Sequence, residues 1–129
     1  IPLSNHHFID NEGFYYLEDL YKAKEKFDVI ILAPPAFVKN QKSLKKGLSG
    51  YQFINEKALG LLPKGGILIS SSCSAHVTDE LFQRMLTLSA GKAGCSLKVI
   101  EIRHQPIDHP FSLSFPEGKY LKYYVILKV

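Results

Sequence analysis

Residues 27–37 read FDVIILAPPAF, an apolar run that ends in two prolines. Successive apolar side chains, without polar alternation, are typical of a strand that is covered on both faces, as in a parallel sheet. Pro34 and Pro35 cannot donate a ladder hydrogen bond, so the strand must end before them. The run therefore predicts a buried parallel strand over 27–32 that stops abruptly at a bend.

Strands and helices alternate on both sides of this run. The expected order is strand 7–9, helix 14–26, strand 27–32, helix 51–62, strand 67–69, helix 78–90, strand 97–102 and strand 120–129. This alternation predicts an α/β protein whose mostly parallel sheet has helices on both faces. The last two strands have no helix between them, so they should pair antiparallel.

The composition sets broad limits on function. With 129 residues, 46% hydrophobic and 22% charged, the chain fits one globular domain, and no segment is apolar enough to span a membrane. Two cysteines are too few for a disulfide framework, so we expect a cytoplasmic protein. The net charge of +4 favours a polyanionic partner such as RNA. A charge that only keeps the protein soluble is an equally good interpretation.

Several segments resemble motifs of one enzyme family. FDVIILAPPAF resembles the Asp/Asn-Pro-Pro-aromatic motif that follows the fourth strand of nucleic-acid and amino-group methyltransferases. GGILISSSCS (65–74) resembles the fifth-strand motif of cytosine-C5 RNA methyltransferases, which ends in a cysteine. DHPFSLSFPEGKYLK (108–122) resembles the closing segment of the 23S rRNA cytosine-C5 methyltransferase family, and GYQFINEKALGLLPKGG (50–66) fits its pattern. The resemblance covers about residues 8–129.

The resemblance implies the C-terminal part of a Rossmann-like, class I S-adenosylmethionine-dependent methyltransferase sheet, with one terminal antiparallel strand. Residues 1–129 would form a single partial domain without the family's first two strands and glycine-rich cofactor turn. The implied activity is methyl transfer to carbon 5 of cytosine in rRNA. S-adenosylmethionine would be the family cofactor, but the isolated chain is not expected to bind it or to be active.

The resemblance assigns Cys73 as the catalytic nucleophile. In the family a cysteine thiolate adds to carbon 6 of cytosine, and such a thiol must lie open to the cleft at a strand end. The competing interpretation is a small buried residue that packs at the end of a strand. We expect Cys95, between a helix and a strand, to be structural.

The resemblance assigns Pro34, Pro35 and Phe37 to a rigid loop that holds the flipped target base. The alternative is an ordinary proline turn with a core phenylalanine. The chain departs from the family at Ala33, where an aspartate is expected to hydrogen-bond the cytosine. Loss of such a group commonly costs about a hundredfold in rate, which puts catalysis in doubt.

Weaker expectations concern the cofactor and RNA. Glu12 aligns with the acidic residue that approaches the cofactor's adenine, but it equally suits the start of a helix. RNA phosphates would meet a basic loop, with His109 of the closing motif as a further contact or a structural histidine. The lysines of this loop are Lys39, Lys42, Lys45 and Lys46, which could equally be solvated. No histidines show metal-ligand spacing, so no metal is expected.

An incomplete sheet would leave the strand Val29–Leu32 as an unprotected edge. We expect this edge either to pair with residues 7–9 or to form a homodimer. Two other functions compete with catalysis. A non-catalytic RNA- or protein-binding remnant of the same fold is favoured by Ala33, and an unrelated flavodoxin-like domain would match these motifs by chance.

Overall fold

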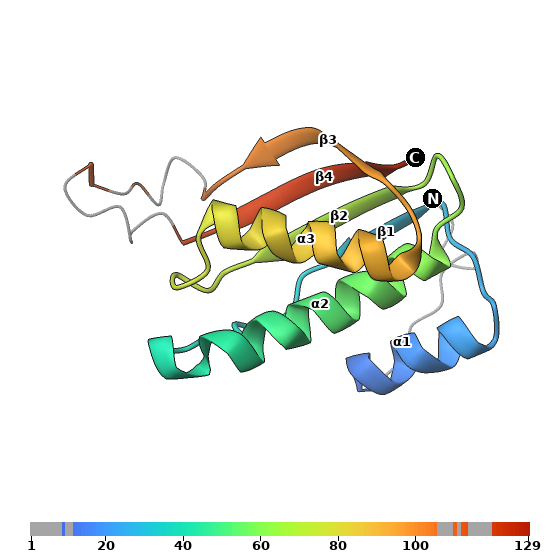
Figure 1. The fold of residues 1–129 in the computed structure, drawn as a ribbon, viewed down its shortest axis with the longest axis horizontal. Helices are drawn as coiled ribbons and strands as arrows, with labels where there is room; N and C mark the ends of the chain where they lie inside the picture. Colours follow the sequence, from blue (N-terminus) through green and yellow to red (C-terminus); the bar gives the residue numbers. More distant parts are fainter. Residues whose placement is uncertain (1–8, 10–11, 106–109, 111, 114–119) are drawn as a thin grey trace.

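The computed structural model describes residues 9, 12–105, 110, 112–113 and 120–129. In this part of the chain a four-stranded sheet is packed against three α-helices (Figure 1). The strands are β1 (Val29–Leu32), β2 (Ile67–Ser72), β3 (Leu97–Arg103) and β4 (Lys122–Lys128). The helices are α1 (Gly13–Lys22), α2 (Leu44–Leu61) and α3 (Asp79–Ala93), and the 3₁₀ turn η2 (Gln41–Ser43) precedes α2.

The spatial order of the strands is β1-β2-β4-β3. β1 and β2 are parallel, whereas β4 lies antiparallel between β2 and β3. The predicted α/β sheet with one terminal antiparallel strand is therefore confirmed. Of the strand predicted over 7–9, only Ile9 is described, and it belongs to no strand; the rest lies outside the described residues.

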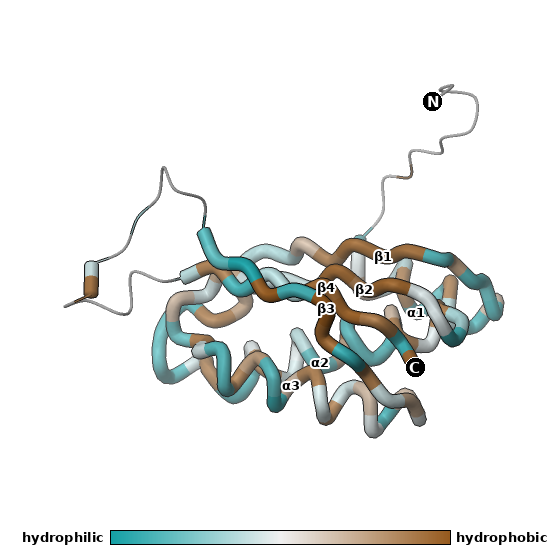
Figure 2. Tube along the Cα trace, turned by 90° about the horizontal axis from the view of Figure 1, so that it is seen from above, coloured by the Kyte–Doolittle hydropathy of each residue, from teal (hydrophilic) through white to brown (hydrophobic). Residues whose placement is uncertain are grey.

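The three described α-helices lie on the same side of the sheet (Figures 1 and 2). The expectation of helices on both faces is therefore wrong for this part of the chain. The connections from β1 to β2 and from β2 to β3 advance across the sheet in one direction. Because crossovers between parallel strands keep one hand, successive helices then fall on one face. A reversal of strand order is needed to place helices on the other face.

The two faces of the sheet differ in burial. On the helix side, Leu68, Tyr124 and Ile126 are fully buried against α2 and α3. On the other side, Val29 and Ile31 of β1 are 54% and 66% exposed. The apolar run of β1 was predicted to be covered on both faces, but in the described structure it is covered on one.

Helix α2 begins earlier than the sequence predicts, at Leu44 rather than at 51. Gly47 and Gly50, which precede the predicted helix, both lie inside the observed one. At Gly47 an added Cβ would lie 2.3 Å from Val38 Cγ2 and 2.8 Å from the carbonyl oxygen of Phe37. Glycine is therefore required here because the segment after β1 crosses the helix at close range.

Candidate functional site

The segments that follow β1 and β2 leave the sheet at the carboxyl ends of these two strands, on the same side of the molecule. Leu32 and Ser70 are paired in the parallel register, so residues 33–38 and 73–77 emerge side by side. Ser71 Oγ, near the end of β2, donates to the carbonyl oxygen of Leu32 at 2.9 Å. We call these two segments the carboxyl rim. The parallel strands predicted over 27–32 and 67–69 imply this juxtaposition of the proline bend and Cys73, because parallel strands end on the same side of a sheet.

A cavity of about 280 Å³ brings together Glu12 and the three residues assigned to the base-holding loop, Pro34, Pro35 and Phe37. Its walls come from the start of α1, the end of β1 and one residue of α2. The remaining lining residues are Gly13, Phe14, Leu17, Ile31, Leu32, Ala33 and Ile54. Neither Cys73 nor any of the four lysines lines it. The cavity therefore unites the predicted cofactor and base residues but excludes the predicted nucleophile.

Cys73 follows the last residue of β2, and its side chain is exposed. Its neighbours Ser72 and Ser74 are both 1% exposed. The interpretation of Cys73 as a small buried residue is therefore wrong. Helix α3 begins six residues later, with Thr78 as its N-cap and its hydroxyl accepting from the Leu81 N–H. An accessible thiol at a strand end is the placement that a nucleophile requires.

Glu12 is the N-cap of α1, and its carboxylate accepts a hydrogen bond from the Tyr15 N–H at 3.0 Å. The prediction that Glu12 starts a helix is thus confirmed, and Glu12 also lines the cavity at the rim. Ligand pockets usually hold about 300–1,000 Å³, so this cavity is smaller than a whole cofactor site. The residues present fit one end of S-adenosylmethionine, not all of it.

The four lysines do not form a loop. Lys39 follows the rim segment, Lys42 lies in η2, and Lys45 and Lys46 lie in the first turn of α2. The expectation of one basic loop is wrong because α2 starts at Leu44, so that Lys45 and Lys46 are helical, and Lys42 lies in the 3₁₀ turn before it. Lys46 lines a second cavity of about 390 Å³, on whose wall Phe37 also lies. Phe37 therefore lines both cavities, together with Phe14.

Phe37 is held by other aromatic rings. Its centroid lies 4.7 Å from that of Tyr51 and 5.6 Å from that of Phe14. These separations are typical of favourable ring contacts. The ring is only partly buried, so it serves as a core contact and as a wall of both cavities.

Of the other predicted residues, His109 lies outside the described part of the chain. Among described residues no group of three His, Cys, Asp or Glu side chains could hold a metal ion. His104 Nε2 lies 3.0 Å from Asp79 Oδ2 at the end of β3, so this histidine has a structural partner. No helix among the described residues has the length and apolar character to cross a membrane.

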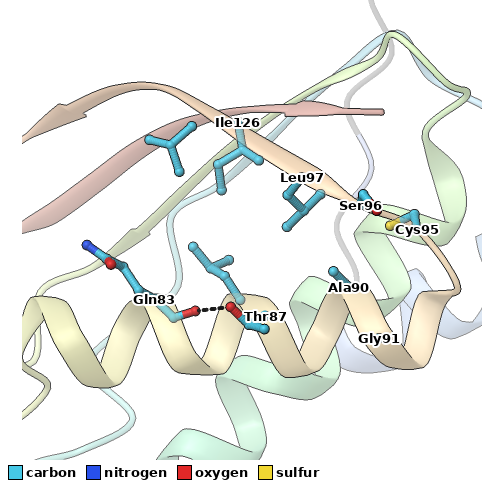
Figure 3. Close-up of a pocket in the computed structure, with 10 residues that line it drawn as sticks. Gln83, Thr87, Ala90, Gly91, Cys95, Ser96, Leu97 and Ile126 are labelled. Atoms are coloured by element: carbon cyan, nitrogen blue, oxygen red, sulfur yellow. Dashed lines mark hydrogen bonds between the residues drawn. The ribbon is translucent and has the colours of Figure 1, made fainter.

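A larger cavity of about 430 Å³ lies away from the carboxyl rim, between α3 and the β3–β4 pair (Figure 3). Its lining is mostly apolar, with Leu97 and Ile126 facing Ala90 across it. Cys95 lies at the end of this cavity and packs against the core, which fits the structural role expected of it. No residue predicted to act on a substrate lines this cavity.

Sequence reasoning missed the polar residues beneath the rim: Tyr51, Ser72, Ser74 and Lys122. All four are at most 1% exposed. One signal was visible in the sequence, a run of serines that continues an apolar strand. Alternate serine hydroxyls of such a strand must point into the core, where each needs a hydrogen-bond partner. The identity of those partners depended on the packing of α2 and β4.

Comparison with known proteins gives curated relatives over nearly the whole chain. Ribosomal RNA large subunit methyltransferase I from Escherichia coli O157:H7 and from Shigella boydii serotype 18 are each 41% identical over 122 residues. The match covers 95% of this chain and 31% of each relative. The chain thus spans about a third of the length of these relatives. No family model matches it.

Solved structures share the fold. A proposed SAM-dependent methyltransferase from Streptococcus mutans superimposes with a TM-score of 0.81 and 24% identity, over 98% of this chain and 31% of that one. A methyltransferase homologue from Pyrococcus horikoshii gives a TM-score of 0.60 and 18% identity, over 94% and 44%. Identities this low establish the sheet architecture alone. The curated relatives, at 41% identity over 95% of the chain, show that the chain belongs to the family of ribosomal RNA large subunit methyltransferase I.

Proposed function

We propose that this chain is the base-modifying part of an RNA methyltransferase that transfers a methyl group to carbon 5 of cytosine in rRNA. The observation that carries the proposal is the exposed thiol of Cys73 beside the Pro34–Pro35 bend, at one edge of a methyltransferase sheet. Parallel strands of α/β proteins present their ligand sites at this edge. The names of the curated relatives support ribosomal RNA as the substrate.

In the proposed reaction the residues of this chain act on the base. The Cys73 thiolate adds to carbon 6 of cytosine, which makes carbon 5 nucleophilic. S-adenosylmethionine, when bound, supplies the methyl group. After carbon 5 is methylated, a base such as water takes its proton, and the electron pair of that C–H bond restores the 5,6 double bond. The bond from Cys73 Sγ to carbon 6 then breaks and the thiolate leaves. Cys73 is thus regenerated, and the product is the 5-methylated base.

The bend has two roles in this proposal. Pro34 and Pro35 fix the backbone, and Phe37 offers a ring beside the cavity on which a flipped base can stack. Glu12, at the far side of the same cavity, would accept a hydrogen bond from the cofactor's adenine amino group. Neighbouring phosphates would meet Lys39, Lys42, Lys45 and Lys46, or His109 in the closing segment.

A second candidate function is RNA or protein binding without catalysis. Ala33, at the lining of the cavity, supplies no carboxylate to the base, and the cavity is small for the whole cofactor. In that case the lysines would bind a polyanion and Cys73 would have no chemical role. Either function is compatible with a homodimer that pairs through the β1 edge and with a cytoplasmic location.

The two functions differ in one measurable step, the covalent addition of Cys73 to cytosine. A short single-stranded RNA carrying 5-azacytidine favours this addition because its ring is more electrophilic at carbon 6, and it slows release because nitrogen replaces the carbon 5 whose proton must be lost. We expect the chain to form an adduct with this RNA without any cofactor, and mass spectrometry should place it on Cys73. The Cys95→Ser variant should form the same adduct, whereas Cys73→Ser should form none.

RNA binding itself is measured on the same variants by fluorescence anisotropy at increasing salt. We expect Cys73→Ser to bind RNA as tightly as the wild type, with affinity that falls as salt rises. Salt-dependent binding without any adduct on Cys73 would replace the catalytic proposal by the non-catalytic one. Absence of both binding and adduct would overturn both.

A further inference from the structure

Beneath the carboxyl rim lies a cluster of three buried hydroxyl groups, those of Tyr51, Ser72 and Ser74, which we call the hydroxyl cluster. Their side chains come from α2, from the last residue of β2 and from the segment that follows it. Tyr51 Oη lies 2.7 Å from Ser74 Oγ, and Ser72 Oγ donates to Tyr51 Oη at 3.0 Å. Tyr51 is 0% exposed, so water does not compete for these bonds.

The cluster also binds the backbone of both rim segments. Phe37 N–H donates to Tyr51 Oη and Val38 N–H donates to Ser74 Oγ, each at 3.3 Å. On the other side, Ser74 N–H donates to Ser72 Oγ at 3.2 Å. Tyr51 Oη accepts two bonds in this arrangement, so its own proton goes to Ser74 Oγ. The proline bend and the Cys73 segment are therefore joined both through the Tyr51 hydroxyl and through the Ser74 hydroxyl.

The same segment is held from the next strand. Lys122, the first residue of β4, is 1% exposed, and its ammonium group donates to the carbonyl oxygen of Ser74 at 2.6 Å. It also donates to the carbonyl oxygen of Tyr120 at 2.5 Å. Cys73 thus lies between two residues that are fixed by buried hydrogen bonds, while its own side chain is exposed. Burying an ammonium group is costly unless it is well paired, so this arrangement constrains the backbone strongly.

We propose that Tyr51 is a positioning residue, which acts through Ser72 and Ser74 to fix the Cys73 thiol relative to the bend that holds the base. This inference rests on the proposed function, because it assigns Tyr51 to the same site. The physical argument is that preorganisation matters within fractions of an ångström when a nucleophile must meet one ring carbon. Tyr51 supplies that preorganisation from within the chain, independently of bound cofactor.

The test compares Tyr51→Phe with Tyr124→Phe. Both variants remove one hydroxyl from a fully buried tyrosine, in α2 for Tyr51 and in β4 for Tyr124. The Tyr124 hydroxyl bonds Asp79 and Gln83 and not the rim segments. Native-state hydrogen exchange is measured at the amides of Phe37 and Val38 and at core amides such as Leu68 and Ile126. A general loss of stability accelerates all of these amides together.

For Tyr51→Phe we expect exchange at Phe37 and Val38 to accelerate about tenfold more than at the core amides, since their shared acceptor network is lost. Tyr124→Phe should show no such excess. Ser74→Ala, which leaves Tyr51 in place, should give the excess at Val38 and provides a second variant if Tyr51→Phe folds poorly. Uniform acceleration in both Tyr51→Phe and Ser74→Ala would overturn the inference.

A second readout links the cluster to the thiol. With saturating azacytidine RNA, Tyr51→Phe should form the Cys73 adduct about tenfold to a hundredfold more slowly, since misplacement by about an ångström can cost about a hundredfold in rate. Alkylation of Cys73 by iodoacetamide should keep its wild-type rate, because the thiol is exposed in either case. An unchanged adduct rate would contradict the inference. If the wild type formed no adduct, the proposed function would fail, and the exchange comparison would still decide whether Tyr51 couples the two segments.

Discussion

At the residue scale, the carboxyl rim combines an accessible thiol with a missing carboxylate. Cys73 is placed as a nucleophile must be, but Ala33 stands where the resemblance calls for aspartate. Ala33 is exposed and lines the cavity with Pro34 and Pro35, so a longer side chain has room there. The chain therefore offers a direct test of what that carboxylate contributes.

We predict that Ala33→Asp accelerates formation of the Cys73 adduct with azacytidine RNA by about tenfold to a hundredfold, because a carboxyl group stabilises the charge that develops on the ring. The rate is measured by mass spectrometry at saturating RNA. Ala33→Asn, which can hydrogen-bond without a charge, serves as control and should give a smaller gain. No gain in either variant would mean that the base is held in another way.

Tyr124 provides a second test at this scale. Burial raises the pKa of Tyr124 from 10.0 to about 12, with a contribution from Asp79 and an opposing one from the Gln83 hydrogen bond. The folded state therefore favours the neutral phenol. The stability linked to this group is complete below pH 10 and is lost as pH rises from 10 towards 12, where only the unfolded chain readily ionises.

We predict that Tyr124→Phe loses less stability than the wild type between pH 10 and 12, because phenylalanine cannot ionise. Urea denaturation followed by circular dichroism at several pH values measures the difference. Lysine ionisation affects the stability of both proteins in the same pH range. Only the difference between their two curves of unfolding free energy against pH therefore measures the ionisation of Tyr124. Parallel curves would show that the phenol ionises equally in both states.

At the scale of elements, α2 determines how the bend approaches the sheet. Gly47 allows the segment after β1 to cross the helix, since a Cβ there would lie 2.3 Å from Val38 Cγ2. Gly91 in α3 is also helical, but an added Cβ there meets no atom within 4 Å. We therefore expect a change from glycine to alanine to alter the stability of the protein in opposite directions at these two positions.

We predict that Gly47→Ala destabilises the chain by about 1–3 kcal/mol, because side chain and backbone must move to avoid overlap. Gly91→Ala should stabilise it by about 0.5–1 kcal/mol, since alanine is the better helix former. Equilibrium unfolding in urea measures both. A stabilising Gly47→Ala would show that the bend moves away from α2 at little cost.

The β1 strand raises a question about assembly. It is an edge of the described sheet, and Ile31 is 66% exposed. Exposed apolar edge strands tend to pair with another strand, whereas a charged side chain on the edge opposes pairing. β3 forms the other described edge and carries Ile102, which is 43% exposed.

We predict that the chain dimerises through β1 at micromolar concentration and that Ile31→Lys shifts it towards monomer. Ile102→Lys, on the opposite edge, should leave the association unchanged. Sedimentation velocity over a concentration series measures both. A wild-type monomer at all concentrations would contradict this prediction.

At the scale of the whole molecule, the chain spans 31% of the length of its curated relatives, and the cavity at the carboxyl rim holds about 280 Å³, below the usual range of ligand pockets. We predict that the isolated chain has no measurable affinity for S-adenosylmethionine in a calorimetric titration. Its RNA binding should persist, because the lysines of α2 and η2 belong to this chain. Tight cofactor binding would show that the described cavity widens to hold the whole ligand.

The sequence alone determined the order of elements, the parallel pairing that places the bend and Cys73 at one edge, and the antiparallel last strand. These follow from local apolar patterns and chain direction. Only the tertiary structure decided that the described helices share one face, that Lys45 and Lys46 are helical, and that Tyr51 joins the two rim segments. Those features depend on packing between residues far apart in the chain, such as Gly47 against Val38 and Lys122 against Ser74. No local pattern encodes such contacts.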